Sequence, residues 1–159
     1  MNNRMTALTN DLATAVHLAR TEAIRRGVSV TVCSGVTIEV EAPSSADASD
    51  TEAEPPKNYA GECNSSRWNQ GWIVIEAGTS PNELIWSSGS AGDSPSINES
   101  SGESVLTFSP RGHLSAPATG AEFWICDDRG AQHATQFKVT KSGHASVSKT
   151  ATPNSSTCS

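Results

Sequence analysis

An amphipathic helix that runs directly into a β-strand constrains this chain more than any other feature of its sequence. Apolar or small residues recur near the N-terminus at three- and four-residue spacing; they are Met5, Leu8, Leu12, Ala15, Val16, Ala19 and Ala23. This spacing places them on one stripe of a helix. Arg25 and Arg26 suit the negative end of the helix dipole, and Gly27 can take the left-handed conformation that ends a helix. We therefore predict one helix over residues 4–26.

Strand patterns fill much of the remaining chain. Val28, Val30 and Val32 alternate with polar residues directly after Gly27, as in a half-buried strand. Similar patterns, separated by Gly, Pro, Ser and Asp, lie at 72–77, 83–87, 104–109, 122–126, 136–140 and 144–148. One helix followed by about seven short strands indicates an α+β fold, in which an N-terminal amphipathic helix packs on antiparallel β-sheet.

Three polar segments show no such pattern. Residues 41–66 are acidic with little to bury, and residues 88–102 are rich in Ser and Gly. We expect both to be exposed loops, the first pinned at Cys63. Residues 150–159 have almost no apolar content and would fray unless Cys158 ties them down.

The distribution of charge bears on the class of partner. The 159 residues fit one domain and carry a net charge of −6, with eleven acidic and two basic residues between positions 33 and 100. Phosphate binding needs a basic face, so this acidic middle disfavours nucleic acid as the main partner, although a local basic patch elsewhere stays open. The sequence contains no run of about eighteen apolar residues that would predict a membrane-spanning helix.

The four cysteines, Cys33, Cys63, Cys126 and Cys158, lack the Cys-x-x-Cys spacing of zinc and thioredoxin-type sites. An even number of well-separated cysteines is typical of an oxidising compartment such as the bacterial periplasm. We favour the pairs Cys33–Cys63 and Cys126–Cys158, because each would fasten a polar segment to a strand. The two other pairings, and four reduced buried cysteines, stay open.

Candidate catalytic groups have simpler explanations. Asp127, Asp128 and His133 lie close in sequence, but Asp-Asp-Arg-Gly is typical of a turn in which Asp accepts backbone hydrogen bonds and Gly130 takes a positive φ. The four histidines, His17, His113, His133 and His144, share no metal-site spacing, and no serine lies in a Gly-x-Ser-x-Gly elbow. For the tryptophans Trp72 and Trp124, and less strongly Trp68, we favour packing over a platform that stacks sugars or bases.

Four sequence blocks follow one another in the order found in a known family. They are residues 19–33 (ARTEAIRRGVSVTVC), 68–74 (WNQGWIV), 106–112 (LTFSPRG) and 123–130 (FWICDDRG). Over roughly residues 4–148 the chain resembles the GspH/FimT-type minor pilins and pseudopilins of bacterial type IV pili and type II secretion systems. The resemblance implies a pilin-like head in a non-catalytic subunit without a cofactor. Such a subunit primes or caps a filament through contacts with other minor pilins and the major pilin.

The resemblance also implies a membrane anchor. Members begin with a cleaved leader and a long hydrophobic helix, whereas this sequence opens on the hydrophilic residues 1–4. We expect that opening to replace the membrane half, with residues 1–27 as the rest of the pilin helix and 28–159 as the globular head. The full-length protein would then hold one helix in the inner membrane and its head in the periplasm or on a surface pilus.

Two alternatives to a pilus-priming subunit remain: a type II secretion pseudopilin and a competence pilin that binds DNA. In the branch that serves DNA uptake, a Gly-Arg-x-Arg motif binds DNA, and the matching residues 143–146 here are Gly-His-Ala-Ser. Neutral His and Ser cannot replace the Arg guanidinium, which is always charged and binds phosphate through two hydrogen bonds. Any DNA contacts are expected on a small positive ridge formed by Lys138, Lys141, His144 and Lys149, and we expect binding to be weak or absent.

Overall fold

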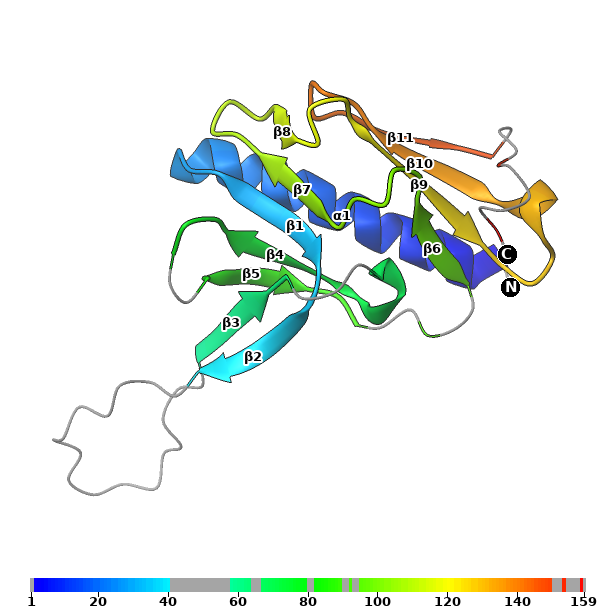
Figure 1. The fold of residues 1–159 in the computed structure, drawn as a ribbon, viewed down its shortest axis with the longest axis horizontal. Helices are drawn as coiled ribbons and strands as arrows, with labels where there is room; N and C mark the ends of the chain where they lie inside the picture. Colours follow the sequence, from blue (N-terminus) through cyan, green and yellow to red (C-terminus); the bar gives the residue numbers. More distant parts are fainter. Residues whose placement is uncertain are drawn as a thin grey trace, which may run out of the picture.

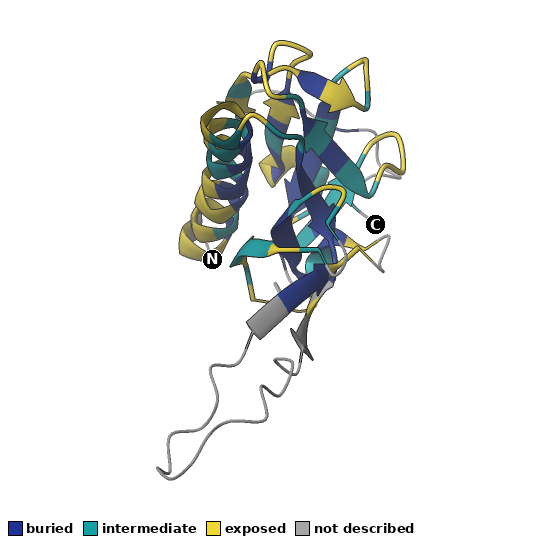
Figure 2. Ribbon diagram, turned by 90° about the vertical axis from the view of Figure 1, so that its left-hand side faces the viewer, coloured by how far each residue is buried: buried dark blue, intermediate teal, exposed yellow. Residues whose placement is uncertain are grey.

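Helix α1 (Asn2–Arg26) lies along two antiparallel sheets and contacts both (Figure 1). The computed structural model describes residues 2–40, 58–63, 67–79, 82–89, 92, 95–149, 153 and 158. Leu12, Val16 and Ala19 are fully buried, and Figure 2 shows the buried face of the helix turned toward the strands. The helix ends where the sequence predicts: Gly27 has φ 68° and donates its N–H to the Ala23 carbonyl at 3.0 Å.

The strand that follows the helix lies at the centre of the first sheet. The order is β5-β4-β1-β7-β8, with β1 (Val30–Ser34), β4 (Trp72–Glu76), β5 (Leu84–Ser87), β7 (Val105–Phe108) and β8 (Leu114–Ala116). All five β1 residues are buried, and Val32 lies opposite Val74 on one side and Leu106 on the other. A strand paired on both edges and covered on both faces favours the β-branched residues found here.

A hairpin covers the face of the first sheet that points away from α1. It consists of β2 (Val36–Val40) and β3 (Asn58–Glu62). Gly61 lies directly against the side chains of Ile73 and Ile75 on β4. Together with Cys33, these two isoleucines form a second, smaller apolar cluster.

The second sheet has the order β11-β10-β9-β6, with β6 (Ser96–Glu99), β9 (Ala121–Cys126), β10 (Thr135–Val139) and β11 (Ala145–Ser148). A 3-10 turn, η2 (Ala131–His133), joins β9 to β10, and another, η1 (Trp68–Gln70), precedes β4. Phe123 and Phe137 are fully buried, and the ring of Trp68 meets Phe123 edge to face at 4.8 Å. The main core therefore lies between α1 and the two sheets.

The predicted α+β class and all seven predicted strands are confirmed, but the two internal segments expected to be loops are partly strands. Residues 58–62 form β3 inside the 41–66 segment, and residues 96–99 form β6 inside the 88–102 segment. β3 is held by its pairing with β2 and by the disulfide at Cys63. β6 has one apolar side chain, Ile97, which is buried opposite Ile125 of β9. Residues 41–57 and 64–66 lie outside the described residues.

Strands β2 and β8 are not among the predicted strands. Val36–Val40 does alternate apolar and polar residues, but only the single residue Gly35 separates it from β1, so the local pattern does not mark it as a separate strand. β8 has three residues, of which only Leu114 is buried. A strand this short carries no periodicity to detect. Among the described residues, no helix is both long enough and apolar enough to cross a membrane.

Candidate interaction surfaces

The four residues of the predicted positive ridge are all exposed, but they do not share one patch. Lys138 lies on β10, opposite Glu122 of β9 on one side and Ser146 of β11 on the other. Lys141 and His144 belong to the turn between β10 and β11. Lys149 follows β11, at the opposite end of that strand. Antiparallel pairing thus spreads the cations along the hairpin and adds a carboxylate that the local sequence does not reveal.

Lys149 lies beside an open groove of about 450 Å³ at the N-terminal end of α1. Residues from the first turns of α1, from η2 and from the β10–β11 hairpin line it; they are Met5, Thr6, Thr9, Asn10, Arg129, Gln132, His133, Ala134, Thr135, Val147 and Lys149. Val147 is 49% exposed here. The groove is mixed in polarity, with the charged Arg129 and Lys149 and the apolar Met5 and Val147 along it.

The Asp127–Arg129 segment is a turn, as the sequence predicts. The Asp127 carboxylate accepts hydrogen bonds from the Arg129 backbone N–H at 3.0 Å and from its Nε at 2.8 Å, while Gly130 has φ 89°. The Arg129 guanidinium holds the pKa of Asp127 below its ordinary value. A carboxylate stabilised in its charged form is a poor proton donor near neutral pH. Arg129 also reaches the sulfur of Met5 at 3.6 Å, which links this turn to α1.

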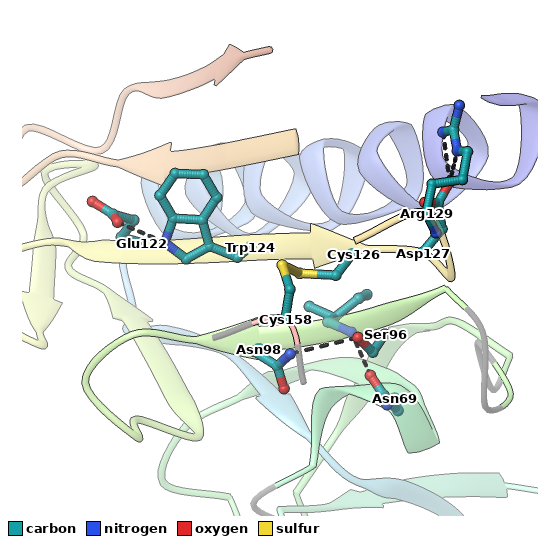
Figure 3. The surroundings of a disulfide bond; sticks show 10 residues. Asn69, Ser96, Asn98, Glu122, Trp124, Cys126, Asp127, Arg129 and Cys158 are labelled. Atoms are coloured by element: carbon teal, nitrogen blue, oxygen red, sulfur yellow. Dashed lines mark hydrogen bonds and ion pairs between the residues drawn. A yellow bond between two sulfur atoms is a disulfide. The ribbon is translucent and has the colours of Figure 1, made fainter. Parts of the chain in front are cut away.

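Two disulfides join the pairs favoured from the sequence, Cys33–Cys63 and Cys126–Cys158. Cys33 is fully buried in β1 and holds the end of the β2–β3 hairpin. Cys126 holds Cys158 of the C-terminal segment against the outer face of β9, beside Trp124 (Figure 3). The Trp124 Nε1–H donates to Glu122 at 2.8 Å. Cross-links over loops of this length stabilise by about 3 to 4 kcal/mol each in chain-entropy models.

Trp68, Trp72 and Trp124 are packing residues rather than a stacking platform. Trp72 is fully buried, Trp68 is 2% exposed and Trp124 is 6% exposed. Trp68 also donates its Nε1–H to the Glu103 carbonyl at 3.0 Å. Rings this enclosed cannot offer a face to a base or a sugar.

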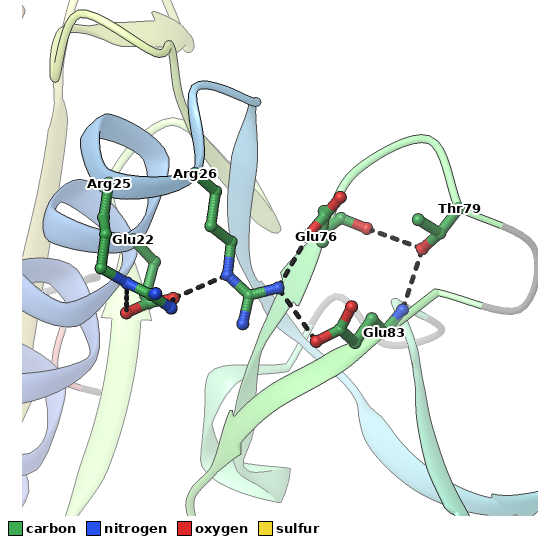
Figure 4. A network of polar contacts seen from close by, with 6 residues as sticks. All are labelled: Glu22, Arg25, Arg26, Glu76, Thr79 and Glu83. Carbon is green, nitrogen blue, oxygen red and sulfur yellow. Dashed lines mark hydrogen bonds and ion pairs between the residues drawn. The ribbon is translucent and has the colours of Figure 1, made fainter.

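A polar network joins the C-terminal end of α1 to the β4–β5 hairpin (Figure 4). Arg26 Nη1 lies 2.8 Å from Glu76 and 2.9 Å from Glu83, and its Nε lies 2.7 Å from Glu22. Hydrogen bonds from Arg25 and Arg26 lower the pKa of Glu22 to about 2. The same carboxylates raise the pKa of Arg26. The network fixes the direction in which the helix leaves the head.

No group of three metal-ligating side chains occurs within the described ranges. The candidate acid and base groups are either paired in a turn, as Asp127 is, or exposed, as His133 is. What the fold presents instead is a long helix fixed to a disulfide-braced head.

Comparisons with known proteins agree with this description. The family model described as "Type II transport protein GspH" matches residues 8–143. A crystal structure of the type IV minor pilin FimU from Pseudomonas aeruginosa PAO1 superposes with a TM-score of 0.68 at 16% identity, covering 97% of this chain and 96% of that one. A second crystal form of FimU gives a TM-score of 0.62, again at 16% identity, with 98% of each chain covered. No curated protein sequence gave a match.

Proposed function

This chain belongs to the GspH family of pilin-like proteins, and we propose that it is a minor type IV pilin that helps to prime or cap a pilus through contacts with other minor pilins and the major pilin. We propose that residues 28–159 are the globular head and residues 1–27 the distal part of a helix whose preceding half anchors the protein in the inner membrane. The head would work in the periplasm or at the cell surface, without catalysis and without a cofactor.

The observation that carries the proposal is the way α1 joins the head. One side of the helix is buried on both sheets, and its opposite side is exposed along its length (Figure 2). The Arg26 network and the Arg129–Met5 contact fasten the helix at its two ends. A helix extended toward its N-terminus would therefore carry the head in one fixed orientation, as a subunit in a helical filament requires.

A type II secretion pseudopilin is the second candidate. The match to the type II transport protein GspH family favours it, whereas the structural match to FimU favours the pilus. Pilin and pseudopilin heads share the fold, so the fold does not separate the two roles. DNA uptake is less favoured, because the four cationic residues of the predicted ridge are spread along the β10–β11 hairpin and Lys138 faces Glu122.

Direct association with neighbouring subunits tests the proposal. The purified head is mixed with purified heads of the pilin-like proteins encoded beside it, and complexes are measured by size-exclusion chromatography with light scattering. We expect a defined complex with at least one minor pilin head. A head that stays monomeric with every neighbour would contradict the proposed role.

A further inference from the structure

Two turns that are far apart in sequence meet at the C-terminal end of α1. Residues 109–113 join β7 to β8, and residues 140–144 join β10 to β11. The Leu114 backbone N–H donates to the Lys141 carbonyl at 3.0 Å. Gly143 is buried so closely against Gly112 that a Cβ on it would overlap the Gly112 carbonyl oxygen. The two turns therefore form one continuous surface.

The surface is cationic, and within the part of the chain that the structure describes its charged side chains have no ion-pair partners. Arg111 and His113 lie on the first turn, and Lys141 and His144 on the second; all four are exposed. Arg20 of α1 lies against both glycines, and its buried Nε has no hydrogen-bond partner among the described residues. The sequence contains no acidic residue from 104 to 121 or from 129 onward. We call the set of Arg20, Arg111, His113, Lys141 and His144, together with Ile24, the basic end.

Ile24 gives the basic end an apolar centre. It lies against Gly112 and is still 52% exposed, the most exposed large hydrophobic side chain among the described residues. An exposed aliphatic side chain next to arginine suits a protein interface, in which the apolar contact supplies affinity and complementary charges select the partner.

Resting on the proposed function, we propose that the basic end is a docking surface for an acidic face of a neighbouring pilin-like head. The partner would place carboxylates against Arg111 and Lys141 and an apolar side chain against Ile24. A protein partner fits better than nucleic acid, because a phosphate backbone has no apolar group to contact Ile24. A protein of net charge −6 would also need a longer row of cations to bind phosphates.

The test compares charge-matched variants of the head. Arg111→Glu with Lys141→Glu alters the basic end, and Lys138→Glu with Lys149→Glu makes the same change in net charge elsewhere on the head. The affinity for each neighbouring minor pilin head is measured by biolayer interferometry, with circular dichroism as a check on folding. We expect the first variant to weaken the dissociation constant about tenfold or more and the second to change it less than about threefold.

Two further variants separate the apolar contribution from the charge. Ile24→Ser removes the proposed anchor, and Val147→Ser removes a similarly exposed side chain at 49% exposure. Ile24→Ser is expected to weaken binding to the same partner about tenfold, and Val147→Ser to leave it nearly unchanged. Raising the salt concentration from about 50 to 200 mM should weaken wild-type binding and hardly affect the residual binding of the Arg111→Glu, Lys141→Glu variant.

The remaining outcomes are distinguishable. If the wild-type head binds no neighbouring head, the proposed function falls, and this inference with it. If it binds and both charge variants weaken binding equally, only the inference falls. A short DNA duplex that binds the wild type and is lost with Arg111→Glu, Lys141→Glu would assign the surface to nucleic acid. Self-association that is lost in the same variant would assign it to a second copy; either result overturns the proposal.

Discussion

Arg26 Nη1 lies 2.8 Å from the Oε2 atom of Glu76, which ties the last turn of α1 to strand β4 across fifty residues of sequence. The same guanidinium contacts Glu83 and Glu22, so one side chain serves three carboxylates (Figure 4). The Arg26 side chain is 24% exposed. Solvent therefore screens its ion pairs less than it screens fully exposed ones. We call Arg26 with its three carboxylates, Glu22, Glu76 and Glu83, the Arg26 joint; it connects the helix to the head.

Loss of this joint should destabilise the head. Arg26→Ala is expected to lower the free energy of unfolding by about 1 kcal/mol, because it leaves two carboxylates of the β4–β5 hairpin side by side without their cation. Arg25→Ala is the matched control: Arg25 is 64% exposed and, among the described residues, pairs with Glu22 alone, so the loss of stability should be smaller. Urea unfolding of both variants measures the difference, and equal losses would contradict the role given to Arg26.

Acid should weaken the same joint. The pKa of Glu22 is lowered from 4.5 to about 2 by hydrogen bonds from Arg25 and Arg26. A lowered folded-state pKa stabilises the fold above the ordinary value, and this contribution is lost as the pH falls from about 4.5 toward 2. The melting temperature of wild type should therefore exceed that of Glu22→Gln above pH 5, with a gap that closes toward pH 2. A gap that stays constant across this range would be inconsistent with the shift.

The buried stripe of α1 should dominate helix docking. Leu12→Ala is expected to cost about 2 to 4 kcal/mol, because Leu12 is fully buried in the main core. Thr21→Ala changes an exposed position on the same helix and should stay within about 0.5 kcal/mol of wild type. Chemical denaturation of both variants decides the matter, and a loss below about 0.5 kcal/mol for Leu12→Ala would mean that the helix does not pack as described.

The contact between the two turns makes Gly143 sensitive to substitution. Gly143 has φ 82°, and a Cβ there would overlap the Gly112 carbonyl oxygen, whereas Gly27 has φ 68° with open space around it. Both Gly→Ala changes incur a backbone cost of about 1 kcal/mol, and Gly143→Ala adds a steric clash, so it should lose at least about 2 kcal/mol. Thermal unfolding compares them, and equal costs would show that the turns do not touch.

Local periodicity predicted the helix and seven strands because their own side chains carry the burial pattern. β3 and β6 were missed because partners distant in sequence hold them: β2 and Cys33 for β3, β9 for β6. Neither strand has enough apolar side chains to give a detectable alternating pattern in the sequence. The turn at Asp127 was predictable because its hydrogen bonds are local.

Surface clusters were harder to predict than elements. The predicted positive ridge consists of cationic residues that are close in sequence. The β10–β11 hairpin, however, places Lys141 and Lys149 at opposite ends of β11, and β9 places Glu122 beside Lys138. The basic end combines α1 with two turns about thirty residues apart, and the Arg26 joint spans 50 and 57 residues. Such groupings follow from sheet order, which local periodicity does not specify.

Deletion of the gene tests most directly whether this protein is a minor subunit needed to build a pilus. Surface filaments are counted by electron microscopy in wild-type cells, in the deletion strain and in the strain complemented with the intact gene. We predict few or no filaments after deletion and full recovery on complementation, with type II secretion unchanged. Normal filament numbers in the deletion strain would contradict the account, and a simultaneous loss of type II secretion would assign the protein to that system instead.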